Sequence, residues 1–329
     1  MKKEYTILII VIIALVLYLA LRKSDRTYYK LPDFAEFSSK QISKIEFISA
    51  DGELELTKKD DQWVVGEKAY PADKNKVGDM LSLLKELKVT ALVSESASYV
   101  RYDLSPNKKI TVKAWAGNRL ERELDIGKVA DTFRHTFVKL PGDKSVYHAE
   151  GNVRPKFDVS LDDIRDKQVM IFDENEMAEV LVQAGNQTLT LTKKEVTEEP
   201  SGSTPEEDTG TADEIEAKTE TKTVWQDSDG DKIDKDLVDR LLSALSDLKC
   251  SGYLEDSKKG DLKNPTHSVT LKGEGKEYTI SLFEKLETEE NEIPGLSSMN
   301  DSPFYFQTWK AKDITDAIQD LLPKTKTAE

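Results

Sequence analysis

Three aspartates alternate with other residues at a spacing that resembles the start of a calcium-binding loop. Asp227, Asp229 and Asp231 stand where the first carboxylate ligands of an EF-hand would stand. That loop needs glycine at its sixth position and glutamate at its twelfth, and this chain has Lys232 and Val238 there. The pattern therefore favours a turn over a metal site.

The other residues that could do chemistry are scattered along the chain. His135, His148 and His267 have no HxH or HxxxH spacing, so a metal site would have to be assembled from distant segments. The only cysteine, Cys250, lies at the end of the repeated helical pattern. We expect it to be a small buried residue. The chain has no GxSxG, no Walker loop and no GxGxxG after a strand. We predict no catalytic, cofactor or metal residues, no cofactor and no enzyme activity.

Aromatic residues offer one alternative role. Trp115 and Trp309, together with Phe304, Tyr305 and Phe306, could line a sugar-binding surface, although strand cores use the same residue types. A cell-envelope glycan-binding or polysaccharide-binding module is therefore a second hypothesis, and an envelope hydrolase is a third, less favoured one.

The charge of the chain limits its partners. A net charge of −15 repels phosphate backbones, so nucleic acid is not an expected partner. Much of this charge lies in segment 195–222, which is rich in acids, Thr, Ser, Pro and Gly and contains almost no apolar residues. Such a segment cannot bury enough surface to offset the cost of ordering. We predict a disordered acidic insertion at 195–222.

A repeated stretch sets the expected architecture. Segment 73–89 recurs as 234–250, and each copy opens with an aspartate followed by apolar residues at helical spacing. Asp73 and Asp234 can each accept hydrogen bonds from the first free amides of a helix. We predict two capped helices, each with its apolar stripe against a sheet.

Near the amino end, the segment from Tyr5 to Leu21 carries no charge. Its length is near the lower limit for a membrane-spanning helix, and it lacks the small residues of a signal-peptide cleavage site. We predict a short tail at 1–4, an uncleaved transmembrane anchor in the lipid bilayer, and a tether at 22–41. Basic residues flank the segment almost equally on both sides, so charge does not fix its orientation.

Strand patterns repeat together with the helix. The alternating hairpin 44–59 has a counterpart at 178–194, and Trp225 answers Trp63. The predicted fold class is α+β: one transmembrane helix, then two duplicated domains, each an antiparallel sheet with one long helix on a face. The predicted domains are 42–172 and 173–323, and the predicted C-terminal tail is 324–329.

Several short motifs resemble the bacterial domain-of-unknown-function family encoded beside gliding-motility-type ABC transporters. The resemblance spans about Ile42 to Leu322, its motifs are structural, and Asp103 stands where that family usually has glycine. The matching residues are Trp63, Pro71-Ala72-Asp73, Val77, Leu84, Leu87, Tyr102-Asp103-Leu104-Ser105-Pro106 and Leu124-Asp125-Ile126-Gly127.

The resemblance implies a role without chemistry. Members resemble membrane-anchored, extracytoplasmic accessory proteins. We therefore expect a non-catalytic accessory or scaffolding component of an ABC-type transport complex, with permease or auxiliary subunits as partners. The expected location is the bacterial inner membrane, with the soluble part in the periplasm.

Overall fold

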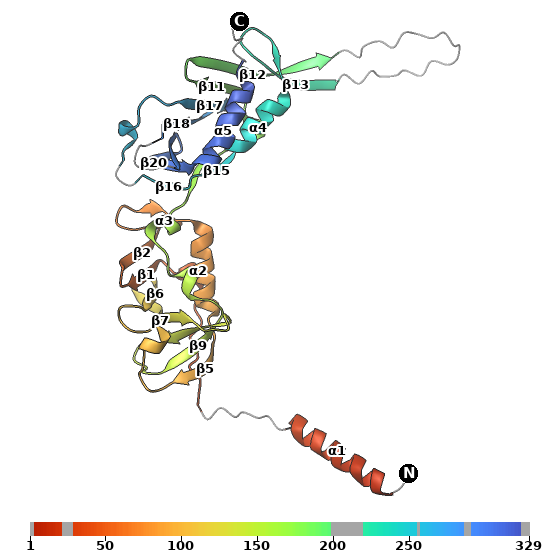
Figure 1. Cartoon of the computed structure of the whole chain (residues 1–329), viewed down its shortest axis with the longest axis vertical. Helices are drawn as coiled ribbons and strands as arrows, with labels where there is room; N and C mark the ends of the chain where they lie inside the picture. The colour runs from red at the N-terminus through yellow and green to blue at the C-terminus, as the bar shows by residue number, and fades with distance from the viewer. Residues whose placement is uncertain (1–2, 22–28, 199–219, 255–256, 286–290, 324–329) are drawn as a thin grey trace, which may run out of the picture. The chain divides into compact units, whose positions relative to one another are not determined.

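The computed structural model describes residues 3–21, 29–198, 220–254, 257–285 and 291–323. The chain divides into two compact units, Met1–Arg165 and Asp166–Glu329. Both are drawn in Figure 1. The division falls a few residues before the boundary at 172/173 expected from the sequence.

The first helix corrects the expectation of a transmembrane anchor. Helix α1 covers Lys3–Leu21. Among the residues that the structure describes, no helix is both long enough and apolar enough to cross a membrane. The physical reason lies in length, because an uncharged helix over 5–21 rises only about 25 Å at 1.5 Å per residue. The hydrocarbon core of a bilayer is about 30 Å thick.

The first unit is built on a nine-stranded antiparallel sheet with the order β4-β3-β2-β1-β6-β7-β8-β9-β5. One long helix, α2 (Lys74–Glu86), and the short α3 (Leu161–Ile164) accompany it. The strands are β1 (Lys44–Ser49), β2 (Gly52–Lys59), β3 (Gln62–Val65), β4 (Tyr70–Pro71), β5 (Val89–Ser94), β6 (Ile110–Ala116), β7 (Arg119–Val129), β8 (His135–Lys139) and β9 (Val146–Glu150).

The second unit repeats this plan with the order β14-β13-β12-β11-β17-β18-β19-β20-β16. A separate two-stranded sheet pairs β10 with β15, and two long helices are present. The elements are β10 (Gln168–Ile171), β11 (Glu179–Ala184), β12 (Gln187–Glu198), β13 (Glu220–Gln226), β14 (Lys232–Ile233), α4 (Lys235–Leu245), β15 (Asp247–Lys249), β16 (Gly252–Tyr253), β17 (His267–Gly273), β18 (Lys276–Leu282), β19 (Glu292–Ser297), β20 (Asn300–Gln307) and α5 (Thr308–Leu321).

The two sheets have the same strand order, and equivalent residues have equivalent partners. Lys58 faces Trp63 across β2 and β3, and Lys193 faces Trp225 across β12 and β13. The predicted fold class nevertheless needs correction, because strands account for 42% of the described residues and helices for 25%. Antiparallel sheet dominates both units, and the second unit packs α5 against α4 instead of carrying a single helix (Figure 1).

The helices predicted from the repeated stretches 73–89 and 234–250 are present with their caps, but they end earlier, at Glu86 and Leu245. The Asp73 carboxylate accepts from the backbone amides of Asn75 and Lys76, and Asp234 accepts from the amide of Asp236. Each helix buries its apolar stripe in the core of its own unit. The buried helix residues are Val77, Met80, Leu81 and Leu84 in α2 and Val238, Leu241, Leu242 and Leu245 in α4.

Part of the predicted tether 22–41 belongs to the first core. Phe37 is buried, and Phe34 packs against the same cluster. The guanidinium of Arg122 lies 4.3 Å from the Phe34 ring centre and 5.1 Å from that of Phe37, and it donates to the Ala35 carbonyl at 3.1 Å. Cation–π contacts of a desolvated arginine contribute about 2 kcal/mol or more, so they help to hold this segment together with the burial of Phe37. Residues 22–28 lie outside the described part.

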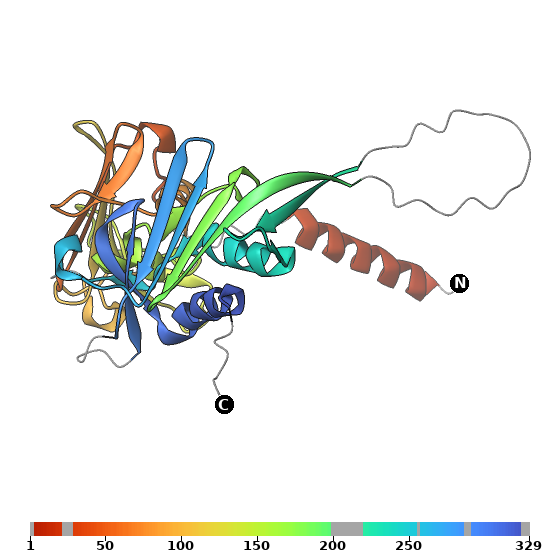
Figure 2. The ribbon, with the colours of Figure 1, turned by 90° about the horizontal axis from the view of Figure 1, so that it is seen from above.

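The predicted acidic insertion begins and ends as strand. The pairing of β12 with β13 continues through Val196↔Lys222 and Thr197↔Thr221 to Glu198↔Glu220. Figure 2 shows these two strands running out together from their unit. β-branched residues such as these favour extended pairing, which the high acid content of the segment obscures. Residues 199–219, the rest of the predicted insertion, and the predicted tail 324–329 lie outside the described residues.

Candidate functional site

The strands of the first sheet expose one face away from the core that α2 covers. Successive strand side chains point to opposite faces, and in β6 the core takes Ile110, Val112 and Ala114. The residues between them therefore point to the other surface, which we call the open face. It carries Lys44, Glu46, Thr111, Lys113, Trp115, Asp125, Phe137 and Lys139.

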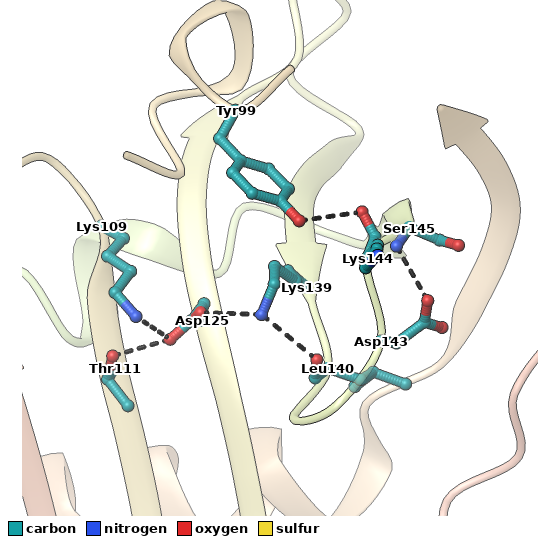
Figure 3. Close-up of polar contacts among 9 residues, drawn as sticks. All are labelled: Tyr99, Lys109, Thr111, Asp125, Lys139, Leu140, Asp143, Lys144 and Ser145. Atoms are coloured by element: carbon teal, nitrogen blue, oxygen red, sulfur yellow. Dashed lines mark hydrogen bonds and ion pairs between the residues drawn. The ribbon is translucent and has the colours of Figure 1, made fainter. Parts of the chain in front are cut away.

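Asp125 is the centre of a polar cluster on this face (Figure 3). Its Oδ1 accepts from Lys109 Nζ at 2.8 Å and from Thr111 Oγ1 at 2.7 Å. Its Oδ2 lies 3.4 Å from Lys139 Nζ, which also donates to the Leu140 carbonyl at 3.4 Å. Strands β6, β7 and β8, together with Lys109 directly before β6, thus supply one carboxylate, one hydroxyl and two ammonium groups. The cluster has one more positive charge than Asp125 neutralises.

Burial and pairing act in opposite directions on the Asp125 carboxyl. Only 12% of its side chain is exposed, and burial alone would raise its pKa. The hydrogen bonds from Lys109 and Thr111, with the charges of Lys109 and Lys139, outweigh that effect and lower the pKa of Asp125. The carboxylate is therefore ionised at neutral pH and is already occupied, so it is poorly suited to act as a base.

A second group of ion pairs, which we call the neighbouring ladder, crosses the open face at β1 and β6 and consists of Lys44, Glu46 and Lys113. Glu46 lies 2.5 Å from Lys44 and 3.9 Å from Lys113. Burial would raise the pKa of Glu46, but the hydrogen bond and charge of Lys44, with the charge of Lys113, lower it. The Lys44 ammonium also lies 5.3 Å from the centre of the Trp115 ring. This part of the face alternates positive and negative groups beside an aromatic ring.

An aromatic cluster borders the Asp125 cluster. The rings of Tyr102 and Phe137 lie 4.8 Å apart, and Phe137 and His148 are also 4.8 Å apart. His135 stacks on His148 at 5.1 Å. Burial and the nearby charge of His135 lower the pKa of His148, so this ring is neutral at physiological pH. The loop that carries Tyr102 is fixed further by Tyr99, whose hydroxyl donates to the Lys144 carbonyl at 3.1 Å (Figure 3).

Two of the sequence motifs are in contact here, because the loop motif 102–106 packs on Gly127 of the strand motif 124–127. A Cβ on Gly127 would clash with the Tyr102 carbonyl oxygen and would lie 2.9 Å from Leu104 Cγ. Asp103 has a φ of 53°, the left-handed conformation that glycine adopts most easily and aspartate tolerates. The glycine at 127 therefore permits the loop to approach the sheet, and the conformation at 103 explains why glycine suits that position.

The structure brings two of the three histidine candidates together. His135 and His148 come together in the first unit, whereas His267 lies in β17 of the second unit. The Asp227 carboxylate accepts from the backbone amides of Asp229 and Asp231, as expected for a turn. In the described part of the chain, no group of three or more His, Cys, Asp or Glu residues is placed to hold a metal ion.

Two of the aromatic residues considered for sugar binding are not on a surface. Phe304 and Phe306 are buried in the core of the second unit and contact each other edge to face. Trp309 is 68% exposed at the start of α5, while Trp115 belongs to the first unit and lies beneath Lys44. The alternation of β20 explains the burial of Phe304 and Phe306.

Sequence patterns do not reveal the Asp125 cluster. Only the pairing of Thr111 with Asp125 could have been predicted, from the hairpin turn at 117–118. The register of β6 and β7 does pair these two residues directly. Lys139 joins only through the pairing of β7 with β8, where a bulge shifts the register. Lysines and aspartates are so common in this chain that no spacing distinguishes Lys109, Asp125 and Lys139 from the others.

The fold and the open face define a class: a tandem β-sheet protein whose polar groups form interlocked ion pairs on a broad strand surface. Comparison with known proteins then gives the family. A model of a domain of unknown function, DUF4340, matches residues 63–265, and the chain belongs to that family. Neither the curated proteins nor the solved structures contain a match to the chain.

Proposed function

We propose that this chain is a non-catalytic binding protein that holds a partner protein on the open face of its first sheet. The observation that carries the proposal is the Asp125 cluster. Its carboxylate is engaged by Lys109, Thr111 and Lys139, so the site offers a fixed pattern of charge in place of a free base. Fixed complementary charges favour specific recognition and rapid encounter.

The neighbouring ladder supports a protein surface as the partner. Lys44, Glu46 and Lys113 alternate in sign beside the Trp115 ring. Protein interfaces combine aromatic anchors with a polar rim in the same way. The resemblance to proteins encoded beside ABC transporters supports a particular partner, the permease or an auxiliary subunit of an ABC-type transport complex, and a location outside the cytoplasm.

Co-purification tests the proposal. The full-length chain is crosslinked in intact cells, purified, and its adducts are identified, with Lys113→Glu as the perturbing variant and Lys85→Glu on the exposed side of α2 as the matched control. We expect recovery of a permease and its ATPase that the Lys113→Glu change reduces and the Lys85→Glu change does not. Consistent failure to recover any transport subunit contradicts the proposal, and sedimentation with purified cell wall would favour the glycan-binding alternative.

A further inference from the structure

The two units differ in the element that comes after their last large strand. In the second unit the chain enters α5, whose Ile314, Ile318 and Leu321 are buried against the sheet and α4. In the first unit the chain makes a short 3-10 turn, Arg154–Lys156, and then the four-residue α3. The same side of the sheet is therefore covered by a long helix in one unit and by a loop in the other.

The end of α5 closes a specific place in the second unit. Leu321 and Leu322 are 5% and 4% exposed, and the Gln187 side chain donates to the Pro323 carbonyl at 3.2 Å. Gln187 opens β12, directly after the turn from β11. Leu189, two residues further along β12, is buried with them. The end of α5 is thus fastened to the β11–β12 turn.

The equivalent place in the first unit is an open groove of about 500 Å³. The registers of the two hairpins make Gly52 the counterpart of Gln187, because Ser49 pairs with Gly52 as Ala184 pairs with Gln187. The groove has an apolar floor of Phe47, Leu54, Ile110, Phe157, Val159 and Leu161. This volume is within the range of pockets that bind small ligands.

The rim of the groove is acidic. Asp51, Glu53 and Asp158 line it, and only Asp158 has an ion-pair partner, Arg154 at 2.9 Å, among the described residues. The corresponding turn of the second unit, 184–187, has no acidic residue. The groove is therefore open and acidic, whereas the equivalent place in the second unit is closed by α5 and carries no acidic residue at its turn. The negative charge of the rim favours an occupant with basic residues.

We propose that this groove binds a peptide segment of a partner protein in which two adjacent aliphatic residues are followed by lysines or arginines. The aliphatic pair would occupy the apolar floor as Leu321 and Leu322 do in the second unit. The basic residues would face Asp51 and Glu53. This binding site is separate from the open face and does not depend on the partner proposed for it.

A synthetic peptide with the sequence of residues 318–327, IQDLLPKTKT, is a suitable probe because it contains the aliphatic pair and two lysines. Its binding to the full-length chain is measured by fluorescence anisotropy. We expect saturable binding, weakened about fivefold or more by the double change Asp51→Lys with Glu53→Lys, and weakened by salt. The matched control, Asp131→Lys with Glu95→Lys, reverses two exposed acids of the same unit outside the groove.

A second variant tests the floor without removing core contacts. Val159→Trp adds volume at a partly exposed position of the floor, so it should abolish peptide binding while the urea unfolding midpoint changes little. A peptide with Asp at both leucine positions should also fail to bind. Absence of saturable binding to the unaltered chain overturns the proposal. Binding that survives both the charge reversal and Val159→Trp does so as well, because the peptide would then be held elsewhere.

Discussion

Replacing Asp125 by asparagine removes one negative charge from between two lysines and leaves the shape of the side chain almost unchanged. The exposed fractions are 12% for Asp125, 29% for Lys109 and 20% for Lys139, between those of surface and buried ion pairs. Hydrogen bonds to charged groups contribute about 1.5–3 kcal/mol, and exposed ion pairs about 0–1 kcal/mol. Asparagine keeps an acceptor for Thr111, so we expect a loss of about 2 kcal/mol.

The dependence of this loss on pH has a definite sign. The folded-state pKa of Asp125 is lowered from its ordinary value, so the ionised form stabilises the fold above the unfolded pKa of about 3.9. That stability is lost as pH falls through the folded pKa. The difference between the unaltered chain and Asp125→Asn should therefore be full at pH 7 and at pH 5.5, and should narrow below about pH 4.

Urea unfolding of the full chain, followed by hydrogen exchange of peptides from each unit, assigns the loss to Met1–Arg165. For a unit of this size, about 2 kcal/mol corresponds to a fall of about 4–8 °C in Tm. Asp103→Asn is the matched control, because the Asp103–Lys108 pair is more exposed and asparagine tolerates the left-handed conformation at 103. Equal stability of Asp125→Asn and Asp103→Asn at pH 7, or a difference that persists at low pH, would refute the reasoning.

Three further changes test other contacts. Arg122→Ala should speed hydrogen exchange in segment 31–41 about tenfold or more, because its rings lose their cation, while Arg119→Ala at an exposed site should not. Gly127→Ala should lower the free energy of unfolding by about 2 kcal/mol or more, because its Cβ would displace the Tyr102 carbonyl, and an unchanged urea midpoint would disprove the close approach. Asp73→Ala should cost about 1 kcal/mol and Asp73→Asn much less, since asparagine can still accept the cap hydrogen bonds; equal losses would argue against capping.

Local signals in the sequence are sufficient for some elements and not for others. The caps and apolar stripes of α2 and α4 are short-range features, and the structure has them as the sequence pattern predicts. The ends differ, because the helices stop at Glu86 and Leu245 and the repeated stretch continues into β5 and β15. Strands β19 and β20 are not predicted from the sequence, because Pro294, Gly295 and Pro303 interrupt the alternation of apolar and polar residues in them. The expectation of a membrane anchor rests on hydropathy near the limit of length, where a difference of one or two residues reverses the conclusion.

The candidate site depends on tertiary pairing. Lys109, Asp125 and Lys139 are separated by more than ten residues each and meet only because β6, β7 and β8 are neighbours. Arg122 likewise contacts Phe34 across a long stretch of chain, so segment 31–37 could not be distinguished from a tether by composition. Predicting either contact needs the strand order and register first.

The central claim is that the open face of the first sheet meets a partner protein, and site-specific photo-crosslinking in living cells tests it most directly. A photoreactive residue is placed at Lys113 on the open face and, separately, at Lys85 on the exposed side of α2. We predict adducts from position 113 with a subunit of an ABC-type transporter and none from position 85. Equal adducts from both positions, or no protein adduct from position 113, would contradict the claim.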